Sequence, residues 1–492
     1  MTFDDFLDLC SKFSVVPVAK RLFSGGESAL SVYERLNDPN EPSFLLESAE
    51  QGIWGRYSFI GVRSRGVLTE KAGSAVWQSE RVATLAEPLA SSPLDALEQL
   101  VACWRSAPSD YPLISGLVGF ASWGLVHELE NLPQAKASDY EIPMIYFNQF
   151  EQLVIVDHVR AELILVSVQF VDGSSEPRSL FEDAQASIAE LEAKLKVPAA
   201  TVLVEPQWPE PDIRLRTVPD DYIAQVEKAK EHVRAGDVFQ VVISQRFDMT
   251  CRASDLGMYR ALRAINPSPY MYLFRGKDAT GTFSIVGASP EALVTVEHGS
   301  AIMHPIAGSR PRGRTAEQDE ELAESLRADS KEQSEHLMLV DLARNDLLKV
   351  CEPDSLLVTE FMQIHRFSHV MHLVSTVTGK LKGGQGAVAA LRATFPAGTL
   401  SGAPKPRALE IIHDLEPTSR GIFGGVIGYF DFQGNADLAI TIRTAFLRDG
   451  LAYIQAGAGI VLDSVPQSEY AETQAKSAAV LRAVAAADAM QP

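Results

Sequence analysis

Residues Asp220–Phe247 read DDYIAQVEKAKEHVRAGDVFQVVISQRF, and this stretch decides the fold class. Its first half repeats apolar side chains at helical spacing, at Tyr222, Val226, Ala229 and Val233. The pair Gly236-Asp237 ends that helix, and Val238–Phe247, rich in Val and Ile, follows as a strand. Helices and strands then mix without strict β–α–β alternation. The sequence therefore predicts an α+β fold with mostly antiparallel sheets.

The chain is long enough for more than one lobe, because 492 residues exceed the size at which a single core usually stops growing. A proline-rich stretch, EPQWPEP from Glu205 to Pro211, blocks both helix and central strand. We expect residues 1–196 to form an N-terminal region, residues 197–218 a linker, and residues 219–492 the catalytic region.

Composition excludes several classes of partner. The formal net charge is −20, which argues against nucleic acid or an anionic membrane as the main partner. The sequence has no apolar run of about 18 residues that could span a membrane. The four cysteines do not have the spacing of metal ligands or of a disulfide framework. The N-terminus carries Asp4 and Asp5, where a signal peptide would carry basic residues. These features predict a cytoplasmic protein.

Two pairs of glutamates are the strongest chemical signal. Glu332 and Glu335 are three residues apart on one predicted helix, and so are Glu469 and Glu472 on another. Residues with this spacing project from the same helix face. Four carboxylates in one place would need a cation, and hard oxygen ligands suit magnesium. The alternative is two solvated helix faces.

Other candidates each have a structural alternative. Arg443 lies in an apolar, strand-like run, where it either forms a structural ion pair or holds a substrate carboxylate. His372 is either a satisfied residue of a strand or an acid–base group. In the predicted helix Leu339–Leu347, we interpret the charges as a salt-bridge network. Each glycine-rich segment, such as Ala397–Lys405, is either a tight turn or a loop that approaches a ligand.

Taken together, these segments resemble the chorismate-utilising enzymes. The matching segments are Pro305–Gly313, Glu332–Leu347, Ala397–Lys405, Gly421–Phe430 and Gln455–Thr473. Within that family the large subunits of anthranilate synthases are most similar. The resemblance implies a fold of two antiparallel sheet layers flanked by helices. It also implies a magnesium-dependent lyase reaction, in which chorismate and ammonia give anthranilate and pyruvate.

The resemblance assigns a role to each matching residue. It implies that Glu335 and Glu472 bind magnesium directly, with Glu332 and Glu469 beside them. It implies catalytic roles for His372, Glu332 and Thr399. The residues that it places around chorismate are Gly308, Ser309, Phe423, Arg443, Gly457, Ala458, Gly459 and Lys476. This chain has Ser309 where the family often has Thr, and Phe423 where it often has Tyr.

The resemblance also implies partners and regulation. No amidotransferase cysteine motif is visible, so the resemblance implies that nitrogen comes from free ammonia or from a separate glutamine amidotransferase subunit. Tryptophan, as feedback inhibitor of the first step of its own biosynthesis, is expected to bind at Glu47, Ser48, Pro269, Tyr270 and Met271. Ser48 would hydrogen-bond this effector, and Glu47 could face its ammonium group. The structural alternative is a strand packed on a proline-rich turn.

Rival activities differ at two positions. The 4-amino-4-deoxychorismate synthase component typically has a nucleophilic lysine where this chain has Ala307. Isochorismate and salicylate synthases usually have a water-activating lysine where this chain has Gln240. From a different class, a non-catalytic amino-acid sensor is disfavoured by the presence of all four glutamates with His372 and Arg443.

Overall fold

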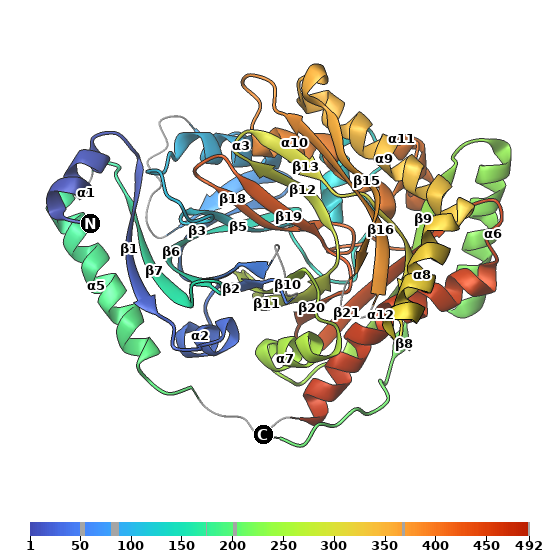
Figure 1. The fold of residues 1–492 in the computed structure, drawn as a ribbon, viewed down its shortest axis with the longest axis horizontal. Helices are drawn as coiled ribbons and strands as arrows, with labels where there is room; N and C mark the ends of the chain where they lie inside the picture. The colour runs from blue at the N-terminus through green and yellow to red at the C-terminus, as the bar shows by residue number, and fades with distance from the viewer. Residues whose placement is uncertain (50–54, 80–87, 174, 200–203, 367–369, 491–492) are drawn as a thin grey trace.

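The computed structural model of the chain describes residues 1–49, 55–79, 88–173, 175–199, 204–366 and 370–490. Its strands form one hydrogen-bonded sheet of 21 members, and every ladder between named strands is antiparallel. This sheet is folded over into two layers that face each other, with helices around the outside (Figure 1). The α+β prediction, with two antiparallel layers flanked by helices, is confirmed.

Two long strands, β3 (Tyr57–Lys71) and β6 (Ile145–Asp157), join the layers. They pair with each other, and β6 pairs with β7 at one end and with β5 at the other. One layer continues from them through β1 (Val15–Phe23), β7 (Glu162–Phe170), β2 (Ser43–Glu47), β10 (Tyr270–Asp278), β11 (Gly281–Ser289), β20 (Thr444–Arg448), β21 (Leu451–Ile460), β9 (Gln240–Thr250), β8 (Arg214–Leu215) and β17 (Gly402–Ala403).

The second layer begins at β5 and ends at a three-stranded corner. Its strands are β5 (Gly116–Ala121), β18 (Val426–Asp431), β19 (Ala436–Ile440), β12 (Ala292–Glu297), β13 (Ser300–Met303), β16 (Val370–Lys380), β14 (Ile306–Pro311) and β15 (Leu357–Arg366), with β4 (Ser74–Gln78) on the end of β3. Figure 1 shows β12, β18 and β19 above β2, β10 and β11.

Helices cover the outer faces. They are α1 (Phe3–Cys10), α2 (Ala29–Leu36), α3 (Pro93–Cys103), α4 (Val126–Leu129), α5 (Pro177–Leu195), α6 (Pro219–Ala235), α7 (Asp255–Ile265), α8 (Ala316–Ala328), α9 (Ser330–Val350), α10 (Ala387–Thr394), α11 (Lys405–Leu415) and α12 (Pro466–Ala489), with short 3-10 turns η2 (Trp123–Leu125), η3 (Pro353–Ser355) and η4 (Gly398–Leu400). None of those in the described ranges is both long and apolar enough to cross a lipid bilayer.

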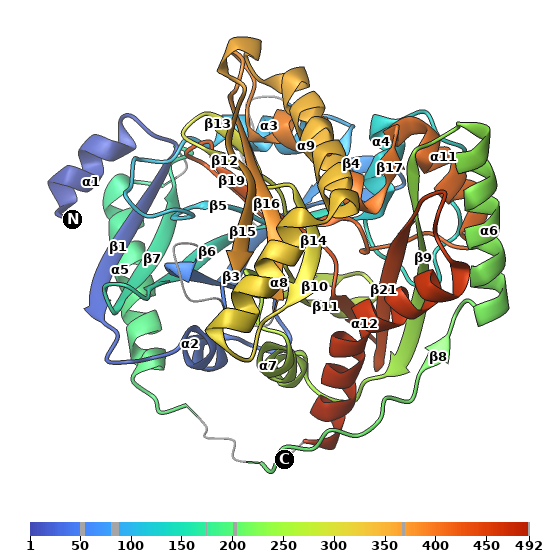
Figure 2. The ribbon, with the colours of Figure 1, turned by 45° about the vertical axis from the view of Figure 1, so that its right-hand side comes forward.

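The helices that carry the glutamate pairs start where local chemistry directs. The Asp329 side chain accepts hydrogen bonds from the backbone N–H groups of Lys331 and Glu332, which fixes the first turn of α9. Pro466 stands in the first turn of α12, where a missing N–H costs nothing. Helix α9 packs against β14 and β16, and α12 packs against β21 and α7 (Figure 2). Both glutamate pairs are therefore on helices, as predicted.

The expected helix at Asp220–Gly236 is α6. It ends at Ala235, and the next residue, Gly236, has a left-handed conformation with a φ of 80°. The expected linker, 197–218, has no helix or strand over residues 204–213 and then forms β8 at Arg214–Leu215. Strands from both sides of this segment pair with each other, β2 with β10 and β5 with β18.

Candidate active site

A bulge in β14 directs the backbone of Gly308 towards His372. The pairing of β14 with β16 shifts by one residue between Ala307 and Ser309, and Gly308 has a φ of 65°. The Gly308 carbonyl oxygen lies 2.8 Å from His372 Nδ1. A carbonyl can only accept, so Nδ1 carries the hydrogen and Nε2 is the acceptor of the neutral ring. Burial lowers the pKa of His372, which favours that neutral ring. Ser309 is exposed.

A second acid–base group, Glu291, was missed by the sequence analysis. It is half-buried between β11 and β12, and its Oε1 accepts a 3.1 Å hydrogen bond from Thr399 Oγ1. Burial raises the pKa of Glu291 to about 7, against the opposing hydrogen bond from Thr399 and the charges of Lys476 and Arg443. A carboxyl group that titrates near neutrality can donate a proton at working pH.

Arg443 does not lie within a strand. The apolar run that suggested a strand is split into β19 and β20, and Arg443 occupies the break with a φ of 49°. Its guanidinium is half-buried, and no hydrogen bond or ion pair joins it to another described residue. Burial lowers its pKa, while Glu291 is the carboxylate whose charge opposes that shift. The sequence left open whether Arg443 forms a structural ion pair or holds a substrate carboxylate. No such ion pair is found in the described part of the chain.

The two glutamate pairs face each other. The charges of Glu332 and Glu472 both act to raise the pKa of Glu335, after burial as the main cause. Burial and the charge of Glu472 likewise raise the pKa of Glu469. Mutual repulsion of this kind is what a hard cation would relieve. Within the described residues, no three Asp, Glu, His or Cys side chains lie close enough together to share a metal ion.

Cations hold two of these glutamates. Lys476 Nζ lies 2.7 Å from Glu472 and 3.0 Å from the Gly457 carbonyl oxygen. Arg310 lies 3.8 Å from Glu332. Lys476 thus joins α12 to β21, the glycine strand, which contains Gly457 and Gly459. It also pairs with Glu472, a predicted magnesium ligand.

The glycine strand β21 lies under Gln240. A Cβ on Gly459 would come within 2.2 Å of Gln240 Nε2, so this glycine leaves room for the Gln240 amide. Gly457 lies on the same face of the strand as Gly459, whereas the side chain of Ala458 points the other way, into the core. Only the backbone of Ala458 could therefore contact a ligand on the Gly457 face.

The contacts join most of the predicted residues into one site. A Cβ on Gly308 would lie 3.0 Å from Glu332 Oε2, so the bulge adjoins helix α9. Phe423 is different: it is buried, and its ring lies 5.5 Å from the Arg420 guanidinium. Asp341 pairs with Arg344 at 3.2 Å within α9, as predicted, whereas Asp346 pairs with Lys405 of α11 at 2.5 Å.

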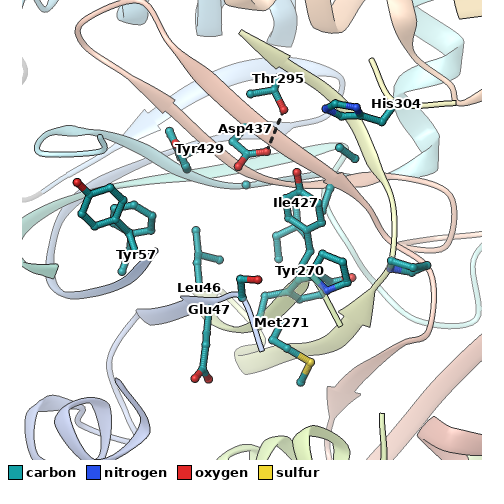
Figure 3. Close-up of a pocket in the computed structure, with 18 of the residues that line it drawn as sticks. Leu46, Glu47, Tyr57, Tyr270, Met271, Thr295, His304, Ile427, Tyr429 and Asp437 are labelled. Atoms are coloured by element: carbon teal, nitrogen blue, oxygen red, sulfur yellow. Dashed lines mark hydrogen bonds between the residues drawn. The ribbon is translucent and has the colours of Figure 1, made fainter. Parts of the chain in front are cut away.

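A cavity of about 380 Å³ lies between the two layers, and the predicted effector residues line it (Figure 3). Ser48 and Pro269, Tyr270 and Met271 form its wall on the β2–β10 side. The Ser48 hydroxyl oxygen is buried and has no hydrogen-bond partner among the described residues. A buried hydroxyl without a partner costs stability, so it is suited to bind a ligand.

Glu47 also lines the cavity, but its carboxylate is hydrogen-bonded to residues outside it. Its carboxylate accepts hydrogen bonds from Tyr259 at 2.7 Å and from Arg263 at 2.8 and 3.0 Å. Figure 3 shows this side chain directed away from the other labelled side chains of the cavity. The carboxylate is paired with Arg263, and its contact with an effector's ammonium group stays a prediction. Strand alternation explains the direction of this side chain, because neighbouring residues point to opposite faces of β2.

The cavity and the candidate active site share a wall. Pro290 and Ala292 line the cavity. Glu291, between them, turns to Thr399 on the other side. Ser289 Oγ lies 3.3 Å from both the backbone N–H and the carbonyl oxygen of Glu291, and so fixes this short turn.

Comparison with known proteins identifies the family of the chain. Residues 41–482 match the family of chorismate binding enzymes. The chain belongs to that family. It is similar to anthranilate synthase component 1 of Arthrobacter globiformis, with 46% identity over 98% of this chain and 92% of the relative. It is also similar to anthranilate synthase component 1 of Mycobacterium bovis, with 45% identity over 99% of this chain and 96% of the relative.

Solved structures show the same fold. Anthranilate synthase component I from Streptococcus pneumoniae superposes with a TM-score of 0.77 at 33% identity, over 94% of this chain and 99% of that one. The menaquinone-specific isochorismate synthase of Escherichia coli superposes with a TM-score of 0.72, over 98% of both chains. Because the two sequences are only 18% identical, this similarity shows a shared fold and nothing about function.

Proposed function

We propose that this chain is the chorismate-converting subunit of an anthranilate synthase. The reaction would take chorismate and ammonia to anthranilate, pyruvate and water. One arrangement carries the proposal. The charges of Arg443 and Lys476 both act on Glu291, and Lys476 pairs with Glu472, so the half-buried Arg443 and the facing glutamates border one site. Chorismate has two carboxylates. Arg443 would bind one bidentately, and a cation held by the glutamates would bind the other.

Glu291 and His372 supply complementary proton chemistry. Ammonia must add to a ring carbon as the ring hydroxyl leaves, and the hydroxyl leaves more easily if it is protonated. Glu291, with a pKa of about 7, is suited to give that proton. The elimination of pyruvate requires a base to remove a ring proton. The acceptor nitrogen of His372, oriented by the Gly308 carbonyl, is suited to take it.

Glu335 and Glu472, with Glu332 and Glu469 beside them, would hold magnesium. The fit rests on their donor chemistry and on the repulsion that raises the pKa of Glu335 and Glu469. Bound there, magnesium would supply positive charge that draws electron density onto the ring carboxylate. Lys476 would release Glu472 to the metal and keep its bond to the Gly457 carbonyl.

Gln240 supports ammonia rather than water as the nucleophile. Its amide lies over Gly459, and an amide cannot act as a general base towards water. Ala307 likewise offers no amine nucleophile. The name component 1 in the relatives supports a second subunit, and a glutamine amidotransferase would supply the ammonia.

We also propose that tryptophan, as feedback inhibitor, binds in the 380 Å³ cavity. The unpaired Ser48 hydroxyl supports this placement. Because Glu47 is paired with Arg263, the effector's ammonium group would instead face Asp437 or Glu297, which also line the cavity.

The decisive assay supplies chorismate, ammonium chloride at alkaline pH and magnesium to the purified chain. We expect fluorescent anthranilate, with pyruvate formed in equal amount and both products identified by mass. Glutamine should not replace ammonium for the chain alone. Formation of isochorismate or of 4-amino-4-deoxychorismate as the end product, or no turnover at all, would refute the proposal.

A further inference from the structure

Arg420 is the largest of the fully buried side chains, with 1% of its side chain exposed. It lies after α11, four residues beyond Glu416, and both guanidinium–carboxylate contacts are short, at 2.6 and 2.8 Å. The cation also stacks on the Trp123 ring at 4.3 Å. Burial of a charge pair is expensive unless every donor is used. Where the remaining hydrogen bonds go therefore indicates what the pair does.

The remaining bonds reach two separate walls of the candidate site. Arg420 Nη1 donates to the Leu400 carbonyl at 2.7 Å, one residue beyond Thr399. Arg420 Nη2 donates to the Val242 carbonyl on β9 at 2.8 Å. Glu416 Oε1 accepts from the Ser244 N–H at 2.8 Å and from its hydroxyl at 2.7 Å.

These backbone groups belong to an interrupted sheet edge. Strand β17 covers β9 only at Gln240 and Val241, and β8 covers it again only from Phe247. Between them the Val242 carbonyl and the Ser244 N–H would lack strand partners. The ion pair replaces the missing strand, with the cation on the carbonyl and the carboxylate on the N–H.

The stabilised residues lie directly opposite the glycine strand. Val242 pairs with Gly459 and Ser244 with Gly457 in the ladder between β9 and β21. One ion pair thus fixes the position of β9 against β21. The same pair fixes the loop that carries Thr399, whose hydroxyl donates a hydrogen bond to Glu291. We propose that Glu416 and Arg420 are positioning residues, which fix the proton donor Glu291 relative to the substrate-facing glycines.

This inference rests on the proposed function for the roles of Glu291 and the glycines and for its kinetic test, whereas the placement of the two segments by the ion pair does not depend on it. Misplacement of a reacting group by about 1 Å can cost ~10²-fold in rate. Arg420→Lys keeps the charge, but an ammonium group cannot serve Glu416 and both carbonyls in one fork geometry. We expect kcat with chorismate and ammonium to fall about 10- to 100-fold, while KM for chorismate changes less than about threefold because Arg443 is untouched.

The matched control is Arg275→Lys. Arg275 is also buried, pairs with Asp255 at 2.7 Å and donates to the Asp38 carbonyl at 2.8 Å, but none of these bonds reaches the candidate site. Both variants should lose thermal stability, and only Arg420→Lys should lose kcat. Glu416→Gln, which keeps the shape and removes the charge, provides a second variant if Arg420→Lys does not fold.

A readout independent of activity separates the two proposals. Hydrogen–deuterium exchange should increase at residues 398–403 and 456–460 in Arg420→Lys or Glu416→Gln, and not in Arg275→Lys. If wild type makes no anthranilate yet exchange increases as described, the proposed function fails and the positioning role stands. Unchanged exchange at both segments, or a kcat equal to that of Arg275→Lys in an active enzyme, would overturn the positioning role.

Discussion

Replacing Glu291 by Gln should make the protein more stable and less active at once. Burial raises the pKa of Glu291 from 4.5 to about 7. The folded state therefore binds this proton more tightly than the unfolded state does. The sign follows: between pH 4.5 and 7 the wild type loses stability as pH rises, because the folded carboxyl resists ionisation that the unfolded chain permits. Gln carries no such penalty, and its carbonyl can still accept from Thr399.

The size of the effect can be worked from the shift. About 2.5 pH units at 1.36 kcal/mol each amount to about 3 kcal/mol above pH 7, and to almost nothing at pH 4.5. For 492 residues the unfolding entropy is about 1 kcal/mol/K. The melting temperature of E291Q should therefore lie ~3 °C above that of wild type at pH 8, and the two melting temperatures should be the same at pH 4.5. Anthranilate formation should fall ~10²- to 10⁴-fold through loss of the general acid.

Calorimetry at pH 4.5, 6 and 8, with anthranilate fluorescence in parallel, measures both effects. Exposed Glu321→Gln on α8 controls for the loss of one negative charge. A melting difference that does not grow with pH, or a variant that is less stable than wild type at pH 8, would refute the assignment of a raised pKa to Glu291.

Two further predictions address the metal and the effector. Glu335→Gln or Glu472→Gln should reduce turnover at least ~10²-fold with the fold intact by circular dichroism, since each removes charge from a hard-ion site; full activity of either variant in EDTA would contradict magnesium binding. Ser48→Phe fills the cavity beside the unpaired hydroxyl and should relieve inhibition by millimolar tryptophan without lowering uninhibited activity; a wild type that is indifferent to tryptophan, or a variant inhibited as strongly as wild type, would show that the site is assigned wrongly.

Local patterns predicted what depends on neighbours in sequence. The end of α6 at Gly236 and the position of both glutamate pairs on helices follow from local spacing and from single residues. The family resemblance added the fold of two layers. Arg443 was expected in a strand because one charge does not interrupt an apolar pattern, whereas the left-handed break is set by how β19 and β20 pair with different neighbours.

Long-range contacts explain what was missed. Glu291 is a lone carboxylate between short apolar runs, and its raised pKa arises only when the two layers close over it, with Thr399 108 residues away. The one signal in sequence was a charged residue after proline at the end of a strand. The pairing of Glu47 with Arg263 was not predicted either, because the two residues are 216 positions apart in the sequence.

The short turn at Pro290–Ala292 borders both the cavity and the candidate active site. Its proline and alanine shape one chamber, and its glutamate serves the other. Evolution cannot alter this turn for one chamber without disturbing the other, so drift there should be slow. A change in what the cavity binds should therefore be recorded on the opposite wall, at Leu46–Ser48 and Tyr270–Met271, which lines the cavity and contributes none of the residues of the candidate active site.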